Sequence, residues 1–152
     1  MQEDYEINKS TLALIPQDEE TTMVYEMDDE FLVKKSTFNI IDASCRYFGS
    51  SYAGRFDGTK ALVGYNYKSP IIIEETNKMI FFPTNSPRHT NCGWISLNNI
   101  KDFLKFDTKS LIIFKGDKKV KIDMSYSSLE NQILRATKLS CVVNEILKKF
   151  GD

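Results

Sequence analysis

The chain has 152 residues, of which 41% are hydrophobic and 27% charged, and its formal net charge is −1. This length suits one domain that buries enough apolar surface to fold without disulfides or a structural metal. No apolar run approaches the roughly 20 residues of a membrane-spanning helix, and the acidic start lacks the basic and apolar regions of a signal peptide, so we expect a cytoplasmic protein without a membrane partner.

The N-terminal part of the sequence predicts short β-strands. Runs rich in branched and aromatic residues recur at residues 4–7, 11–15, 22–27 and 31–34. Turn-forming or strand-breaking residues separate them at Asn8-Lys9-Ser10, at Pro16 with the acidic residues after it, and at Asp28-Asp29-Glu30. The pattern predicts two β-hairpins.

The stretch from Asp42 to Thr59 predicts the central helix, which we expect at about residues 40–54. Asn39 is a weak candidate for its cap, and Gly54 and Gly58 are placed to end it. Helical spacing puts an apolar stripe on one side, made of Ile41, Cys45, Phe48 and Tyr52. The other side combines one cation with small side chains, at Arg46, Gly49, Ser50 and Ala53.

Two interpretations of this small-residue face compete. In the first, the small side chains allow another part of the same protein to pack closely against the helix. In the second, Arg46 and Arg55 flank a shallow platform that meets an anion, most plausibly a phosphate backbone. The face by itself does not choose between them.

The middle of the chain predicts a further hairpin and a functional loop. Residues 71–73 and 79–82 flank Glu75-Thr76-Asn77, and one of the two strands should be buried on both faces. Residues 83–91 then form a loop with two prolines, Arg88 and the only histidine, a composition more often associated with function than with a core. Trp94, after this loop, is expected to anchor the core.

The last third predicts a second hairpin and a long helix. Residues 97–106 fit either a strand or a short helix, and residues 111–114 pair with 120–124 across Lys115-Gly116-Asp117-Lys118. Lysines at such a tip usually protect a sheet edge, although they also suit a phosphate backbone. The capping box Ser127–Glu130 begins a helix at about 127–150, stopped by Gly151. Its apolar stripe comprises Leu129, Ile133, Ala136, Leu139, Val143, Ile146, Leu147 and Phe150, opposite Asn131, Arg135 and Lys138.

Together these elements predict an α+β fold in a single domain over residues 1–152, of mostly antiparallel short strands with the central and C-terminal helices. Charge divides along this domain. Residues 1–37 contain ten acidic and three basic residues, a net charge of −7, whereas residues 38–152 contain 17 basic and 11 acidic residues, a net charge of +6. An acidic head on a basic body would attract polyanions, unless folding mixes the charges into a uniformly solvated surface.

The sequence lacks the motifs of common enzymes. It has no phosphate-binding glycine motif for a nucleotide, and Gly49-Ser50-Ser51-Tyr52-Ala53 departs from the setting that a serine nucleophile needs. The three cysteines are far apart, which argues for reduced structural thiols, although His89 and Cys92 could join Cys45 and Cys141 in a scattered metal site. We expect no enzymatic activity, no cofactor, no metal and no small-molecule ligand.

Three segments resemble one family of proteins. They are Cys45-Arg46-Tyr47-Phe48-Gly49-Ser50-Ser51-Tyr52-Ala53-Gly54-Arg55, then Cys92-Gly93-Trp94-Ile95-Ser96, then Ser125-Tyr126-Ser127-Ser128-Leu129-Glu130-Asn131-Gln132. In this order they resemble the ComK competence transcription factors of Gram-positive bacteria, over nearly the whole chain. Members of that family commonly continue past the last helix into a basic tail that an adaptor reads for the Clp protease. This sequence ends at Asp152, so the resemblance does not extend adaptor control to it and leaves two alternatives, a short member of the family or an incomplete one.

The resemblance implies an activator of DNA-uptake genes that binds paired A/T-rich boxes through the DNA minor groove and assembles as dimers or larger oligomers. Arg46, Arg55, Arg88 and Arg135 lie in or beside the matching segments. With lysines chosen as phosphate contacts, the candidate DNA-binding residues are Arg46, Arg55, Lys60, Arg88, Lys115, Lys118, Arg135 and Lys138. The alternative is an interaction module that dimerises with a longer relative and modulates it without binding DNA.

Overall fold

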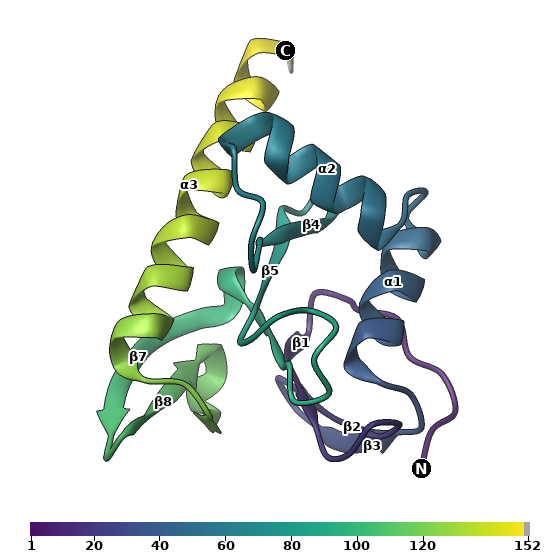
Figure 1. Ribbon diagram of the computed structural model, residues 1–152, viewed down its shortest axis with the longest axis vertical. Helices are drawn as coiled ribbons and strands as arrows, with labels where there is room; N and C mark the ends of the chain where they lie inside the picture. The colour runs from purple at the N-terminus through teal and green to yellow at the C-terminus, as the bar shows by residue number, and fades with distance from the viewer. Residues whose placement is uncertain (151–152) are drawn as a thin grey trace.

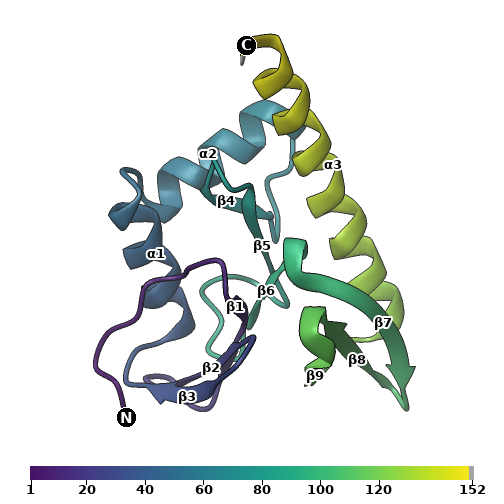
Figure 2. The ribbon, with the colours of Figure 1, turned by 180° about the vertical axis from the view of Figure 1, so that it is seen from behind.

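A six-stranded antiparallel sheet forms the centre of the computed structural model, which describes residues 1–150. Its strands lie in the order β3-β2-β1-β6-β5-β4 (Figures 1 and 2). Their bounds are β1 Thr11–Pro16, β2 Thr22–Glu26, β3 Glu30–Val33, β4 Ile71–Glu74, β5 Met79–Pro83 and β6 Trp94–Ser96. The hairpins β2–β3 and β4–β5 confirm their predictions, and β5 is buried along its whole length, as expected.

The predicted strand at residues 4–7 is wrong, because this segment pairs with no strand of the described chain. The backbone N–H of Ile7 donates instead to the hydroxyl of Ser44, at 3.0 Å. The side chain of Ile7 is buried in the core cluster that also contains Ile40 and Ile41. Its apolar character therefore serves packing against a helix, and β1 forms its hairpin with β2.

A second, three-stranded sheet has the order β7-β8-β9. It consists of β7 Ile100–Phe106, β8 Lys109–Phe114 and β9 Lys119–Ile122, and all its pairs are antiparallel. The ambiguous segment before it forms a short 3-10 turn, Leu97–Asn99, followed by β7. Gly116 has a φ of 81° in the turn between β8 and β9, which confirms the predicted role of this glycine.

Three helices cover the large sheet: α1 Thr37–Tyr47, α2 Tyr52–Val63 and α3 Tyr126–Phe150. Side chains alternate across the sheet, so that Ile71, Phe81 and Trp94 pack with α1 and the start of α2. Ile72, Phe82 and Ile95 belong to the opposite cluster with α3 and the small sheet. Figures 1 and 2 show α3 along one side of the molecule, α1 along the other, and α2 crossing between them. The predicted α+β class is confirmed, as is Trp94 as a fully buried anchor.

The prediction of a single central helix is wrong, because the chain turns sharply between α1 and α2. Gly49 adopts a φ of 90°, and Ser51 caps α2 by accepting from the N–H of Gly54 at 3.0 Å. The cap of α1 is Ser36, not Asn39. Gly54 and Gly58 lie inside α2, which ends at Gly64 with a φ of 79°. A side-chain cap and a left-handed glycine thus divide a stretch whose apolar spacing fits one continuous helix.

We expect the substitution Gly49→Ala to lower the free energy of unfolding by about 1–2 kcal/mol, because a left-handed backbone strains a residue with a Cβ. No other atom lies within 4 Å of the added Cβ, so the loss would come from the backbone alone. Urea denaturation followed by circular dichroism measures it.

The matched control is Gly58→Ala, which is equally unobstructed but lies inside α2. Alanine favours a helix over glycine, so this variant should gain about 0.5–1 kcal/mol. Equal effects of the two substitutions would contradict the assigned turn.

The C-terminal helix is confirmed within one residue of its predicted start, but its cap is Ser125, whose hydroxyl accepts from the N–H of Ser128 at 3.2 Å. Leu129, Ala136 and Leu139 are buried as predicted. The predicted stripe fails at its end, because Ile146, Leu147 and Phe150 are exposed. The predicted stop at Gly151 lies outside the described residues. None of the described helices combines the length and hydropathy that crossing a membrane requires.

Candidate nucleic-acid interface

Two of the predicted arginines meet on the exposed side of α1. Arg46 lies in the last turn of α1, and its Nε donates to Oδ2 of Asp42 at 2.9 Å. Arg88 reaches the same surface from the loop between β5 and β6, where its guanidinium lies 4.4 Å from the ring centre of Phe38. Phe38 in turn contacts Tyr52 edge-on. Phe38 and Asp42 are four positions apart in α1, so two cations from distant parts of the sequence lie on one face of this helix.

Asp42 also fixes the corner between α1 and α2. Its Oδ1 accepts from the backbone N–H of Tyr52 at 2.9 Å. Burial raises the pKa of this carboxyl, but the hydrogen bonds from Arg46 and Tyr52, with the charges of Arg46 and Arg88, hold it below its usual range. A lowered pKa means that Asp42 stabilises the fold above its ordinary pKa and loses this contribution as the pH falls through the lowered value. At neutral pH it partly neutralises the two arginines.

Arg46 and Arg55 do not flank one platform, since they lie on different helices. The side chain of Arg55 is only 16% exposed and forms an ion pair with Glu75 at 3.0 Å. Glu74 and Glu75 line the cleft of about 450 Å³ beside it, with Gly49 and Ser50. Two carboxylates at this cleft disfavour an anion there. Gly49 serves the turn between α1 and α2 through its left-handed backbone.

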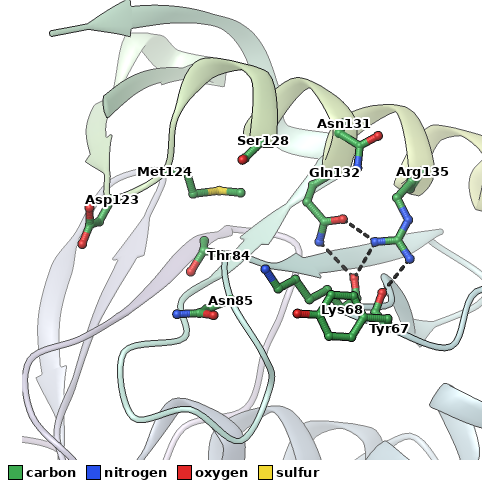
Figure 3. A pocket seen from close by; sticks show the side chains of 10 residues that line it. All are labelled: Tyr67, Lys68, Thr84, Asn85, Asp123, Met124, Ser128, Asn131, Gln132 and Arg135. Carbon is green, nitrogen blue, oxygen red and sulfur yellow. Dashed lines mark hydrogen bonds between the residues drawn. The ribbon is translucent and has the colours of Figure 1, made fainter. Parts of the chain in front are cut away.

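The guanidinium of Arg135 binds backbone carbonyls of the protein itself. Its guanidinium donates to the carbonyls of Tyr67 and Lys68, at 2.6 and 3.1 Å, and to Oε1 of Gln132 at 2.6 Å. Figure 3 shows these contacts on one wall of a polar cleft. Burial lowers the pKa of Arg135, although an arginine remains charged in proteins. Arg135 thus holds the loop between α2 and β4 against α3.

Lys118 joins the two sheets. Its ammonium donates to the backbone carbonyls of Glu26 and Asp29, at 3.2 and 3.0 Å, and lies 3.8 Å from the carboxylate of Glu30. A lysine from the basic C-terminal part of the chain therefore contacts the acidic turn between β2 and β3. The remaining candidates, Lys60, Lys115 and Lys138, have exposed side chains.

The sequence did not identify Lys68, which lines the cleft in Figure 3 together with Arg135. The loop that carries it has no helical or strand periodicity to place its side chains. The alternation Tyr65-Asn66-Tyr67-Lys68 was the available signal, since aromatic and cationic side chains side by side are typical of nucleic-acid contacts.

The scattered metal site does not assemble in residues 1–150, where no three side chains among His, Cys, Asp and Glu gather around a common point. Cys45 and Cys92 are buried in the same core cluster, and Cys141 is exposed. Burial raises the pKa of Cys45 to about 12 and that of Cys92 to about 11. Both thiols are therefore neutral at physiological pH.

Comparison with known proteins gives one consistent match. Residues 2–148 match the sequence model of a family described as "ComK protein". A competence transcription factor of Bacillus subtilis (strain 168) is 38% identical over 138 residues, which cover 88% of this chain and 71% of that protein. No solved structure matches the chain.

Proposed function

Because this chain belongs to the ComK family, we propose that it is a DNA-binding transcription activator of competence genes. The observation that carries the proposal is the pair of arginines on one face of α1, Arg46 bonded to Asp42 and Arg88 stacked on Phe38. The related competence transcription factor named above supports the same role.

The arginine pair suits the minor groove of A/T-rich DNA. A narrow A-tract minor groove concentrates negative potential and attracts arginine side chains. Arg46 is 65% exposed along its side chain, and its one hydrogen-bonded partner among the described residues contacts Nε alone, which leaves both terminal nitrogens of the guanidinium for a ligand. We assign Arg46 and Arg88 to the groove and the exposed Lys60, Lys115 and Lys138 to backbone phosphates. The other three candidates donate hydrogen bonds to groups of the protein itself, and we assign them the positioning of loops. They are Arg55, Lys118 and Arg135.

Specificity requires more than one protomer in this proposal. The minor groove distinguishes A·T from G·C pairs but not A·T from T·A, so one arginine pair reads little sequence. Two copies bound at a fixed spacing would also select DNA by the distance between its two boxes. We therefore propose that the protein recognises paired A/T-rich boxes as an oligomer.

The direct test compares a duplex carrying two A/T boxes with a duplex of the same length in which the boxes are replaced by G/C pairs. Affinity is measured by fluorescence anisotropy from 50 to 300 mM salt. We expect tighter binding to the A/T duplex and an affinity that falls linearly with salt on logarithmic axes. Equal affinity for both duplexes, or affinity independent of salt, would falsify the proposed recognition.

Asp42 provides a second test, because it lowers the positive potential beside Arg46. We expect Asp42→Asn to bind DNA about fivefold more tightly, since two charges about 4 Å apart in water interact by roughly 1 kcal/mol. The asparagine keeps an oxygen that can accept from the N–H of Tyr52, so the corner should persist. The same anisotropy assay measures the change.

The matched control is Asp57→Asn, which removes an exposed carboxylate from α2. It changes the net charge equally, so any general electrostatic effect should appear in both variants. A gain in affinity of the same size in both would contradict a specific role for Asp42.

An interaction module that modulates a longer relative is the second candidate function. Exposed apolar side chains near the end of α3, Ile146, Leu147 and Phe150, favour it. Light scattering of the protein alone and with DNA separates the two functions. A protein that associates without binding DNA, and that still associates when Arg46 and Arg88 are changed to glutamate, would support this second function.

A further inference from the structure

A polar cleft on α3 contains a lysine that the proposed arginine pair does not use. The cleft has a volume of about 360 Å³ and lies between the first turns of α3, the loop before β4 and the start of the loop after β5 (Figure 3). It is lined by Tyr67, Lys68, Thr84, Asn85, Asp123, Met124, Ser128, Asn131, Gln132 and Arg135.

The backbone of Lys68 is held in an unusual conformation. Its φ is 47°, a left-handed value that residues with a side chain adopt at a cost. Its carbonyl accepts from Nε2 of Gln132 at 3.0 Å and from Arg135 at 3.1 Å. Gln132 is 4% exposed and also donates to the carbonyl of Pro83 at 2.9 Å. These contacts hold the backbone of Lys68, and its ammonium points into the cleft toward Thr84 and Asn85 (Figure 3).

The charge of Lys68 has no carboxylate partner among the described residues. Its ammonium lies 5.3 Å from the ring centre of Tyr67, and no ion pair of residues 1–150 includes it. The one acid that lines the cleft, Asp123, lies 3.4 Å from the ammonium of Lys109. Arg135 adds a second positive charge to the wall. The cleft is therefore electropositive.

The remaining polar groups leave room for an anion. Thr84 already accepts from the N–H of Gly93, and the amide of Asn85 donates to Asn91. Ser128 and Asn131 also line the cleft from α3. The hydroxyl of Ser128 accepts from that of Ser125 at 2.9 Å, which leaves its own O–H to donate. Since one water occupies about 30 Å³ in the liquid, this volume holds a phosphate group with several waters.

We propose that this cleft binds a phosphate group through the ammonium of Lys68, with Asn131 and Ser128 as further hydrogen-bonding groups. The loop between β5 and β6 begins at Thr84 and Asn85 in the cleft and also carries Arg88. In this proposal, the phosphate is a phosphodiester of the duplex that Arg46 and Arg88 hold. That identification of the source rests on the proposed DNA-binding function, whereas the phosphate site itself does not.

Lys78 offers a matched control, because it is the other lysine with comparable backbone geometry. Its φ is 53°, and it lies in the turn between β4 and β5, outside the cleft. Lys68→Gly and Lys78→Gly each remove one positive charge. Each also removes the backbone strain of a side-chain-bearing residue at positive φ, because glycine adopts this conformation freely. Both variants should therefore be at least as stable as the unmodified protein in thermal unfolding, which separates loss of binding from loss of fold.

The experiment has two arms, one with DNA and one with inorganic phosphate. With the A/T-box duplex, Lys68→Gly should reduce the slope of log affinity against log salt by about one, the loss of a single phosphate contact. Lys78→Gly should leave the slope unchanged. With inorganic phosphate alone, the amide NMR signals of Ser128 and Asn131 should shift in the unmodified protein and in Lys78→Gly, but not in Lys68→Gly.

Each outcome decides a separate point. If Lys68→Gly reduces the salt slope of DNA binding, the site exists and its ligand is the DNA backbone. If Lys68→Gly abolishes the phosphate-induced NMR shift but leaves the salt slope unchanged, the site exists and binds free phosphate. Identical behaviour of both variants and the unmodified protein in both arms would overturn the site, even if Arg46 and Arg88 prove essential for binding. If the unmodified protein binds no DNA, the proposed function fails and the phosphate arm alone decides on the cleft.

Discussion

Changing both Arg46 and Arg88 to alanine is expected to weaken binding to A/T-box DNA by about a hundredfold or more. A well-placed arginine contact in a groove contributes about 1–3 kcal/mol, and the two residues lie on one face of α1. Neither arginine supports the core, because Arg46 lies in an exposed ion pair and Arg88 on the outer side of Phe38. Such contacts contribute about 1 kcal/mol or less to stability, so the variant should remain folded.

Fluorescence anisotropy against the A/T duplex, with circular dichroism as a check of folding, measures this effect. The control is Lys9→Ala with Lys34→Ala, which removes the same net charge from exposed positions of the acidic head. Affinity within threefold of the unmodified protein, or an equal loss in the control, would show that the arginine pair is not the centre of recognition. Replacing both arginines by lysine should restore part of the affinity but less of the A/T preference, because lysine lacks the planar fork of donors.

The largest expected effect on stability belongs to Trp94→Ala. The indole is fully buried and lies edge-on to Tyr52, so it links β6 to the start of α2. Truncating a buried tryptophan costs about 3–5 kcal/mol, a large share of the 5–15 kcal/mol that stabilises a typical domain. Urea denaturation followed by circular dichroism should show a large fall in the midpoint.

Trp94→Phe is the graded comparison. Within residues 1–150 the indole Nε1 has no hydrogen-bond partner, so phenylalanine loses volume but no hydrogen bond. It should therefore cost much less than alanine. A loss below 1 kcal/mol for Trp94→Ala would mean that the large sheet and α2 do not depend on this contact.

Local sequence patterns predicted most of the strands, because the signals of a hairpin lie in residues close together in the chain. The hairpin β4–β5 and the turn at Gly116 are examples, in which branched residues flank a turn that glycine or polar residues favour. The break between α1 and α2 combines the left-handed Gly49 and the Ser51 cap with Asp42, which accepts from a backbone N–H ten positions later. Apolar spacing runs through this break without a change, so sequence alone predicted one helix.

The candidate interface shows the same division. Arg46 and Arg88 were both expected among the DNA contacts, but they are 42 positions apart, and only the folded chain brings them to one face of α1. Lys118 and Arg135 look like free cations in the sequence, whereas in the structure they donate to backbone carbonyls. Composition cannot distinguish these two uses of a positive charge. Lys68 went unnoticed for the reverse reason, since its importance lies in a clamped backbone.

The order of the large sheet has a consequence for biosynthesis. β1 lies between β2 and β6, and its Leu14 is opposite Trp94, eighty positions later in the chain. While the ribosome is still making the middle of the protein, β1 to β3 can pair among themselves, but one edge of β1 stays open until β6 has emerged. Pairing over such a separation is slow, and an open apolar edge attracts other chains. Nascent chains that stall before β6 should therefore aggregate or require a chaperone, because this edge of β1 has no partner in them.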